Sequence, residues 1–244
     1  MKNSVCFIDK VLDFIVKRLR INHINISSNL NDGRLNSSQN EFEIMETIKN
    51  DKEITNYLQK NNLSLISSKA REWYDFALQH KNNKNIFFPI NIKVTDLSRN
   101  NADNLNVKLG IYFALTGIRP TFDNQIKWKD FFNKLSDDFE ETSCDYYFLV
   151  INKLNTADIF WNSLKNLSEI SAAGNNLPFQ CVWNKNRNRN KEVKNYYEAK
   201  KMIMNTFEES IRQRAMILIH FQQAFGNKKK QEIFKEKKKF SIKL

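Results

Sequence analysis

The chain is predicted to form an α/β (α+β) domain with a central mixed β-sheet flanked by helices. Two observations carry this prediction. Segments with helical spacing and short strand-like runs follow each other in the order helix, helix, strands, helix, strand, strand, helix. No internal repeat and no Pro/Gly-rich linker divides the 244 residues, a length that fits one domain with a sizeable core. We therefore expect a single domain over residues 1–226, followed by a basic tail over residues 227–244.

Helical spacing is clear at the start of the chain. In Ser4–Arg20 the apolar residues recur at helical spacing, and Asp9 and Asp13 fall on other faces. This pattern predicts a docked helix rather than a targeting segment. Asn22–Asn40 is rich in Asn and Ser and is predicted to be a loop, and Glu41–Lys60 is predicted to be a second helix.

Strand-like runs occupy the next part of the chain. Leu63–Ser67 is a candidate strand, and Tyr74–Gln79 alternates in the manner of a strand. The turn-like Lys81–Asn85 leads from there into a third candidate strand, Ile86–Val94. The second half of the chain is predicted to hold helices at Asp103–Thr116 (stopped by Gly117), Trp128–Leu135 and about Glu192–Phe225, and strands at Asp145–Asn152 and Phe179–Trp183.

Charge and composition limit the classes of function. The net charge of +12 favours a polyanionic partner, although the tail alone, with eight Lys and two Glu, supplies a net +6. No apolar run has the length of a membrane span. The three Cys and three His are scattered without metal-ligand or catalytic-triad spacing, which favours a reducing cytoplasm and argues against a zinc site.

The chemistry-bearing residues lie on the two central strand candidates. Successive strand residues point to opposite faces, so Ile90 and Ile92 point one way and Asn91 and Lys93 the other. A hairpin can therefore bring Asp75 to the same place as Asn91 and Lys93. These three residues nearly spell the metal-dependent nuclease motif Asp…(Asp/Glu)-x-Lys, with an amide in place of the second acid. Carboxylate, amide and carbonyl oxygens suit Mg²⁺, so Asp75, Asn91 and the Ile92 carbonyl are the candidate ligands, and Lys93 is the candidate base or charge stabiliser.

The same residues carry a resemblance to a known family. Trp73–Leu78 and Pro89–Thr95 resemble the two catalytic strands of EcoRV- and HincII-like type II restriction endonucleases, members of the PD-(D/E)XK superfamily. Tyr74 stands where the family has Pro, and Asn91 where it has an acid. The resemblance implies an accessory catalytic acid at Glu46, a homodimer that cuts double-stranded DNA with Mg²⁺ at a short palindrome, and a companion DNA methyltransferase.

Two sets of residues are expected to touch DNA. By resemblance, Lys69 and Arg71 would lie in a minor-groove loop, and Gly174, Asn175 and Asn176 in a loop that reads bases in the major groove. Dense amides and hydroxyls after the catalytic strand suit phosphates and base edges. That second set is Thr95, Ser98, Arg99, Asn100 and Asn101.

Two other functions stay open on the sequence. Loss of the second carboxylate is compatible with a DNA-binding protein of nuclease fold that no longer cuts. The basic composition also fits an RNA-binding protein, though less well than a duplex-binding one.

Overall fold

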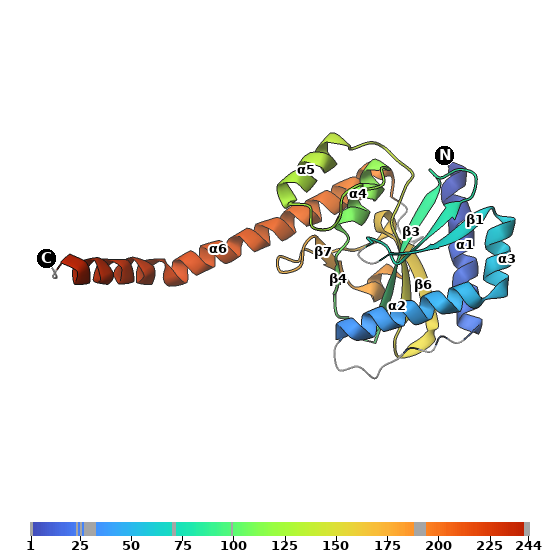
Figure 1. Cartoon of the computed structure of the whole chain (residues 1–244), viewed down its shortest axis with the longest axis horizontal. Helices are drawn as coiled ribbons and strands as arrows, with labels where there is room; N and C mark the ends of the chain where they lie inside the picture. The colour runs from blue at the N-terminus through green and yellow to red at the C-terminus, as the bar shows by residue number, and fades with distance from the viewer. Residues whose placement is uncertain are drawn as a thin grey trace.

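The computed structural model describes residues 2–22, 24, 26, 33–69, 72–98, 100–187 and 194–241. Within them a five-stranded mixed sheet has the order β1-β2-β3-β5-β6 (Figure 1). Only β3 and β5 run parallel; the other neighbours are antiparallel. The strands are β1 Leu63–Ser67, β2 Phe76–His80, β3 Phe87–Thr95, β5 Tyr147–Asn152 and β6 Asn155–Ser163, with β4 Asp103–Leu105 and β7 Phe179–Cys181 forming a separate two-stranded sheet.

Helices cover both faces of the five-stranded sheet. On one face α1, α2 and α3 form an apolar core with residues such as Ile90 and Ile92. On the other face α4, α5 and the first part of α6 pack over Phe148 and Val150. The predicted α+β class with a central mixed sheet is confirmed. The helices are α1 Lys2–Ile21, α2 Gly33–Asn50, α3 Lys52–Lys60, α4 Lys108–Thr116, α5 Trp128–Asp137 and α6 Tyr196–Ser241, with short 3₁₀ turns at Leu164–Asn166 and Trp183–Asn186.

The first helix is docked as predicted. Its apolar residues, among them Ile8, Leu12 and Ile15, are fully or almost fully buried against the sheet. No helix in the described part of the chain is both long and apolar enough to cross a bilayer.

The second predicted helix is wrong in both its start and its continuity. The predicted loop over 22–40 is helical from Gly33 on, and a break at Asp51 separates α2 from α3. The Asp51 carboxylate accepts the backbone N–H groups of Glu53 and Ile54 at 2.8 and 3.0 Å. An N-cap of this kind starts a new helix, which periodicity alone does not register.

Three predictions in the second half also change. The predicted helix Asp103–Thr116 is a strand followed by a helix, because Asp103–Leu105 pairs with Phe179–Cys181 from far along the chain. The predicted strand Phe179–Trp183 ends at Cys181, and β6 was not predicted. The last helix begins at Tyr196 and continues to Ser241, through most of the predicted tail. Lys, Glu and Gln are good helix formers, so the helix needs no core contact to continue.

Candidate active site

The β2–β3 hairpin positions the Asp75 carboxylate beside β3. Phe76 is paired with Ile90 in the antiparallel register, and the Asp75 N–H donates to the Ile90 carbonyl at 2.9 Å. The Ile92 N–H then donates to Asp75 Oδ2 at 2.5 Å. The carboxylate thus lies against β3 between the positions of Asn91 and Lys93, whose side chains point away from the core that Ile90 and Ile92 enter.

The pKa of Asp75 is strongly shifted. Burial raises it most, and the negative charge of Glu41 raises it further. The Ile92 N–H and the Lys93 charge act in the opposite direction, and the balance leaves the pKa at about 7. A buried carboxyl group whose pKa lies near neutral is a common sign of a functional site.

Glu41 rather than Glu46 is the acid of α2 whose charge acts on Asp75. Glu46 pairs with Lys49 at 2.9 Å, and both side chains are partly open to solvent. Glu41 lies more than one helical turn before Glu46 on α2, and the accessory role expected of Glu46 stays a prediction.

The Asn91 side chain leaves a buried oxygen without a partner. Its Oδ1 atom is closed off from solvent and accepts no hydrogen bond from the described residues. The amide end of Asn91 is engaged: a side-chain hydrogen bond from it lowers the pKa of Tyr146, against the larger rise caused by burial and the further rise from the Asp75 charge. A buried acceptor without a donor costs free energy, so Asn91 Oδ1 is a polar atom of this site that the described residues leave unsatisfied.

Tyr146 is a site residue that sequence reasoning missed. Its hydroxyl donates to the Trp73 carbonyl at 2.6 Å. The negative charges of Asp75 and Glu41 raise the pKa of this hydroxyl. A Cβ atom added at Gly110 would lie 2.8 Å from the Tyr146 ring, so a glycine on α4 makes room for this ring. No motif marks Tyr146, because it reaches the site only through the parallel pairing of β5 with β3.

The donor atoms at this place suit Mg²⁺. Asp75 supplies a carboxylate, Asn91 Oδ1 supplies a neutral oxygen, and the Ile92 carbonyl lies on the Asp75 side of β3, as its N–H does. Glu41 adds a negative charge that acts on Asp75. No group of three or more His, Cys, Asp or Glu in the described residues could hold a metal ion. Mg²⁺ takes only one or two carboxylates and keeps several waters, so this donor set fits it better than a zinc site.

The predicted phosphate-facing segment after β3 lies at the surface. Thr95 ends the strand, and Ser98 is held by Asp96, whose Oδ1 accepts from the Ser98 N–H and hydroxyl at 2.9 and 2.6 Å. The exposed residues of the predicted DNA-contact sets here are Lys69, Ser98, Asn100 and Asn101. Arg71 and Arg99 lie outside the described residues.

The predicted base-reading loop requires a correction at Gly174. Gly174 is buried, and a Cβ there would lie 2.8 Å from Gln213 Cβ, so the space beside this glycine is filled by α6. The Gly174 N–H donates to Gln213 Oε1 at 3.1 Å, and its carbonyl accepts from Arg214 Nε at 2.9 Å. Asn175 and Asn176 are exposed and remain available for contact.

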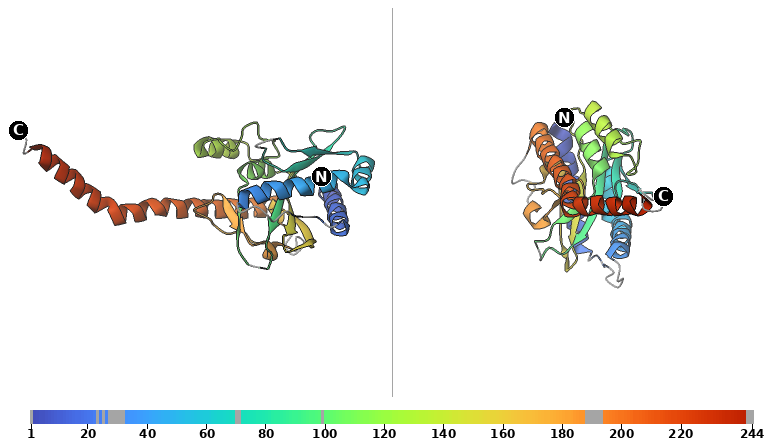
Figure 2. Two further views of the ribbon diagram at one scale, coloured as in Figure 1. Left: turned by 60° about the horizontal axis from the view of Figure 1, so that its bottom comes forward. Right: turned by 90° about the vertical axis from the view of Figure 1, so that its left-hand side faces the viewer.

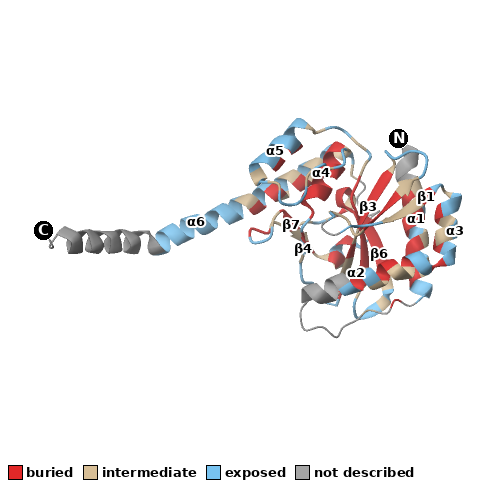
Figure 3. Ribbon diagram, in the orientation of Figure 1, coloured by how far each residue is buried: buried red, intermediate tan, exposed pale blue. Residues whose placement is uncertain are grey.

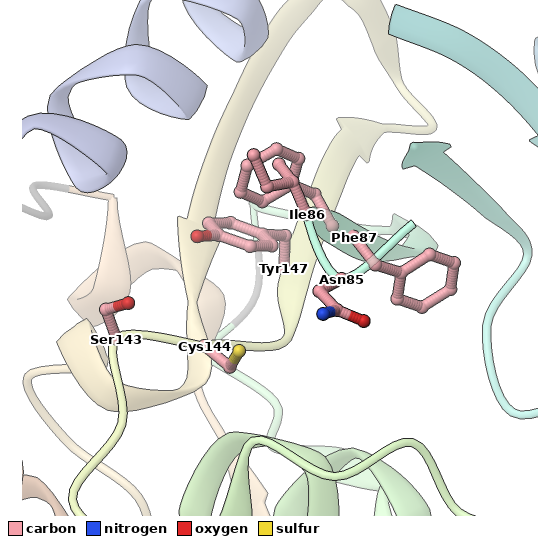
Figure 4. Close-up of a pocket in the computed structure, with 7 residues that line it drawn as sticks. Asn85, Ile86, Phe87, Ser143, Cys144 and Tyr147 are labelled. Carbon is pink, nitrogen blue, oxygen red and sulfur yellow. The ribbon is translucent and has the colours of Figure 1, made fainter. Parts of the chain in front are cut away.

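A small pocket elsewhere on the sheet is distinct from this site. It has a volume of about 90 Å³ and lies at the start of β3 and β5, lined among others by Phe87, Cys144 and Tyr147 (Figure 4). None of Asp75, Asn91 and Lys93 lines it.

No protein family model matches this chain, and no curated protein matches it in sequence.

Proposed function

We propose that this chain is a Mg²⁺-dependent endonuclease that cleaves double-stranded DNA, of the type II restriction kind that its two central strands resemble. One observation carries the proposal. On one face of β3, the buried and unpartnered Asn91 Oδ1 lies beside a carboxyl group, Asp75, whose pKa is raised to about 7. A divalent cation would satisfy both groups at once, because it supplies the missing partner for the oxygen and favours the ionised carboxylate.

Each residue of the site has a separate role in the proposed reaction. Asp75, Asn91 Oδ1, the Ile92 carbonyl and Glu41 would hold the cation, which neutralises charge on the scissile phosphate and activates water. Lys93 would orient the attacking water and stabilise the charge that develops on the phosphate oxygens. Tyr146 positions Asn91 through their hydrogen bond. The net charge of +12 favours the approach of a nucleic acid.

The partners follow from the same proposal. A protein that cuts both strands of a palindrome pairs with a second copy about a two-fold axis, and a restriction enzyme is accompanied by a DNA methyltransferase in the cytoplasm. Exposed Asn175 and Asn176 are available for adenine edges, to which amides can make paired hydrogen bonds.

A second function is favoured by one residue. Asn91 lacks the charge of the usual second acid, which weakens cation binding, and a DNA-binding protein that does not cut would carry such a change. Glu41 counts against this alternative, because it restores a second negative charge close to Asp75.

Cleavage of phage DNA separates the two functions. The purified chain is expected to give discrete fragments with Mg²⁺ and none with excess chelator, and Asp75→Ala is expected to give none under either condition. Binding of duplex DNA without any cutting, in Mg²⁺ or Mn²⁺, would favour the inactive DNA-binding protein instead.

A further inference from the structure

A polar hollow lies at the end of the sheet where β5 begins and β6 ends. It has a volume of about 350 Å³, and Asp9 of α1, Ser163 of β6, Lys165 of the following 3₁₀ turn and Tyr196 of α6 are among its lining residues. Only the start of α6 lines the hollow, and the later part of that helix projects away from the body (Figures 1 and 2). The residues of the candidate active site do not line it, so the two places are separate.

Every residue that lines the polar hollow carries a polar side-chain group. Lys165 and Lys194 bring ammonium groups, Asp9 and Asp145 bring carboxyl groups, and the others bring hydroxyl groups and one amide. The volume is within the range of small-molecule sites, about 300–1,000 Å³, but the walls of such sites are mostly apolar. A wall of this composition suits a small and strongly polar ligand.

Lys165 brings an incompletely bonded donor to the hollow. The residue is 8% exposed, and its Nζ donates to the carbonyls of Thr142 and Cys144 at 2.8 and 2.7 Å. An ammonium group has three protons, and these hydrogen bonds within the described residues engage two of them. Because a buried charged donor is costly to leave without an acceptor, a carboxylate from a ligand would stabilise Lys165.

Acceptors line the same hollow. Ser163 is 1% exposed at the buried end of β6 (Figure 3), and its Oγ accepts no hydrogen bond from the described residues. Burial raises the pKa of the Tyr147 hydroxyl most, and the negative charges of Asp145 and Asp9 raise it further, so both acids act on one wall. This hydroxyl points away from Phe87 in Figure 4. An ammonium group from a ligand would supply the donor that Ser163 Oγ lacks and would be attracted by both acids.

We propose that the polar hollow binds a free α-amino acid. The amino acid carboxylate would accept from Lys165, and its ammonium group would donate to Ser163 Oγ in the field of Asp9 and Asp145. The hydroxyl and amide groups that remain in the wall favour an uncharged polar side chain, such as that of glutamine.

The charges of the wall favour this class of ligand over simple ions. Inorganic phosphate would be attracted by the two lysines but repelled by the two carboxyl groups, and a divalent cation would be repelled by the lysines. A zwitterion finds an opposite charge for each of its ends. The inference does not rest on the proposed nuclease function, since it uses no residue of the Asp75 site.

Calorimetric titration of the full chain with glutamine tests the proposal. The dissociation constant is expected to lie below about 1 mM, and leucine and inorganic phosphate are expected to bind more weakly. N-acetylglutamine lacks the ammonium group and glutamine methyl ester lacks the carboxylate. Each is expected to bind at least about tenfold more weakly than glutamine, because a charged hydrogen bond is lost.

Two variants and a control locate the binding. Asp9→Asn and Ser163→Ala are each expected to weaken glutamine binding about tenfold, whereas Asp137→Asn at the exposed end of α5 should bind as wild type does. Circular dichroism establishes that the variants stay folded, and the two glutamine derivatives test the same contacts in the unaltered chain. Absence of glutamine binding at millimolar concentration, tighter binding of phosphate, or equal binding of glutamine and its two derivatives would overturn the proposal.

Discussion

The Asp75 site and the projecting part of α6 depart from ordinary globular structure in opposite ways. At the site, Asn91 Oδ1 is buried and accepts no hydrogen bond from the described residues, and the Asp75 carboxyl group is buried and feels the negative charge of Glu41 in its raised pKa. On α6, large apolar side chains are exposed, Leu218 and Ile217 foremost. The first arrangement motivates the proposed cation site, and the second leaves apolar side chains in contact with water.

The two arrangements lie in different parts of the molecule. A buried unsatisfied oxygen costs free energy, and at Asn91 this cost is borne on a central strand of the sheet. An exposed apolar helix costs free energy that a second protein surface offsets, and it can project far from the sheet.

The largest effect is expected at Lys93. Lys93→Ala should lower DNA cleavage by about 10²–10⁴-fold, the usual contribution of a positioned proton-transfer group. Mg²⁺ binding should persist, because no ligand is removed. The matched control is Lys60→Ala at the exposed end of α3, which should cleave as wild type does. Equal cleavage activity of the two variants would show that Lys93 has no role in catalysis.

The next effect concerns stability and pH. The pKa of Asp75 is raised to about 7 in the folded chain, so the folded chain favours the neutral carboxyl group. The contribution of Asp75 to the free energy of unfolding is therefore complete below about pH 4, and it is lost as the pH rises through 7. Asp75→Asn should therefore raise the free energy of unfolding by about 1–3 kcal/mol at pH 8 without metal, and by less at pH 5.

Urea unfolding at both pH values measures this, with and without Mg²⁺. Added Mg²⁺ should stabilise the wild type and leave Asp75→Asn nearly unchanged. A stabilisation by Asp75→Asn that is the same at pH 5 and pH 8 would contradict the raised pKa.

A smaller effect distinguishes packing from DNA contact in the loop after residue 172. Gly174→Ala places a Cβ 3.0 Å from the Arg214 nitrogen, so the loop or α6 must shift, at a cost of about 1–2 kcal/mol. Asn175→Ala, on the exposed side of the same loop, should change stability by less than about 0.5 kcal/mol. Chemical denaturation measures the free energy of unfolding of both variants. If Gly174→Ala left this free energy unchanged, the loop would not depend on its packing against α6.

The smallest effect separates the two acids of α2. Glu41→Gln should weaken Mg²⁺ binding about tenfold, equal to about 1.4 kcal/mol, because a negative charge near the cation is lost. Glu46→Gln should bind Mg²⁺ as wild type does, since Glu46 pairs with Lys49 at the surface. Calorimetric titration measures the Mg²⁺ affinity of both variants. A larger loss of affinity in Glu46→Gln than in Glu41→Gln would favour Glu46 as the accessory acid.

The sequence predicted the fold best where a pattern is local. Alternation along Ile86–Val94 was enough to place Ile90 and Ile92 in the core and Asn91 and Lys93 on the other face. It failed where distant residues decide: Asp103–Leu105 is a strand only because β7 pairs with it.

The same contrast between local patterns and distant contacts applies to the site. Asp75, Asn91 and Lys93 lie on one hairpin, so strand geometry brings them together. Tyr146 arrives through a parallel neighbour, and Glu41 was not distinguished from Glu46 because helical spacing alone does not fix how α2 is rotated over the sheet. Gly174 was assigned to DNA because a glycine that contacts a helix and one that contacts a ligand are identical in sequence.

The Asn91 side chain offers the most direct test of the central claim, that this face of β3 binds a cation and cleaves DNA. Cleavage of duplex DNA should be measured against Mg²⁺ concentration for the wild type, Asn91→Asp and Asn91→Ala. We expect the wild type to cut, Asn91→Asp to cut at equal or lower Mg²⁺, and Asn91→Ala to lose activity because the oxygen ligand is gone. Wild-type activity that survives unchanged in Asn91→Ala, or no cutting by either the wild type or Asn91→Asp, would contradict the account.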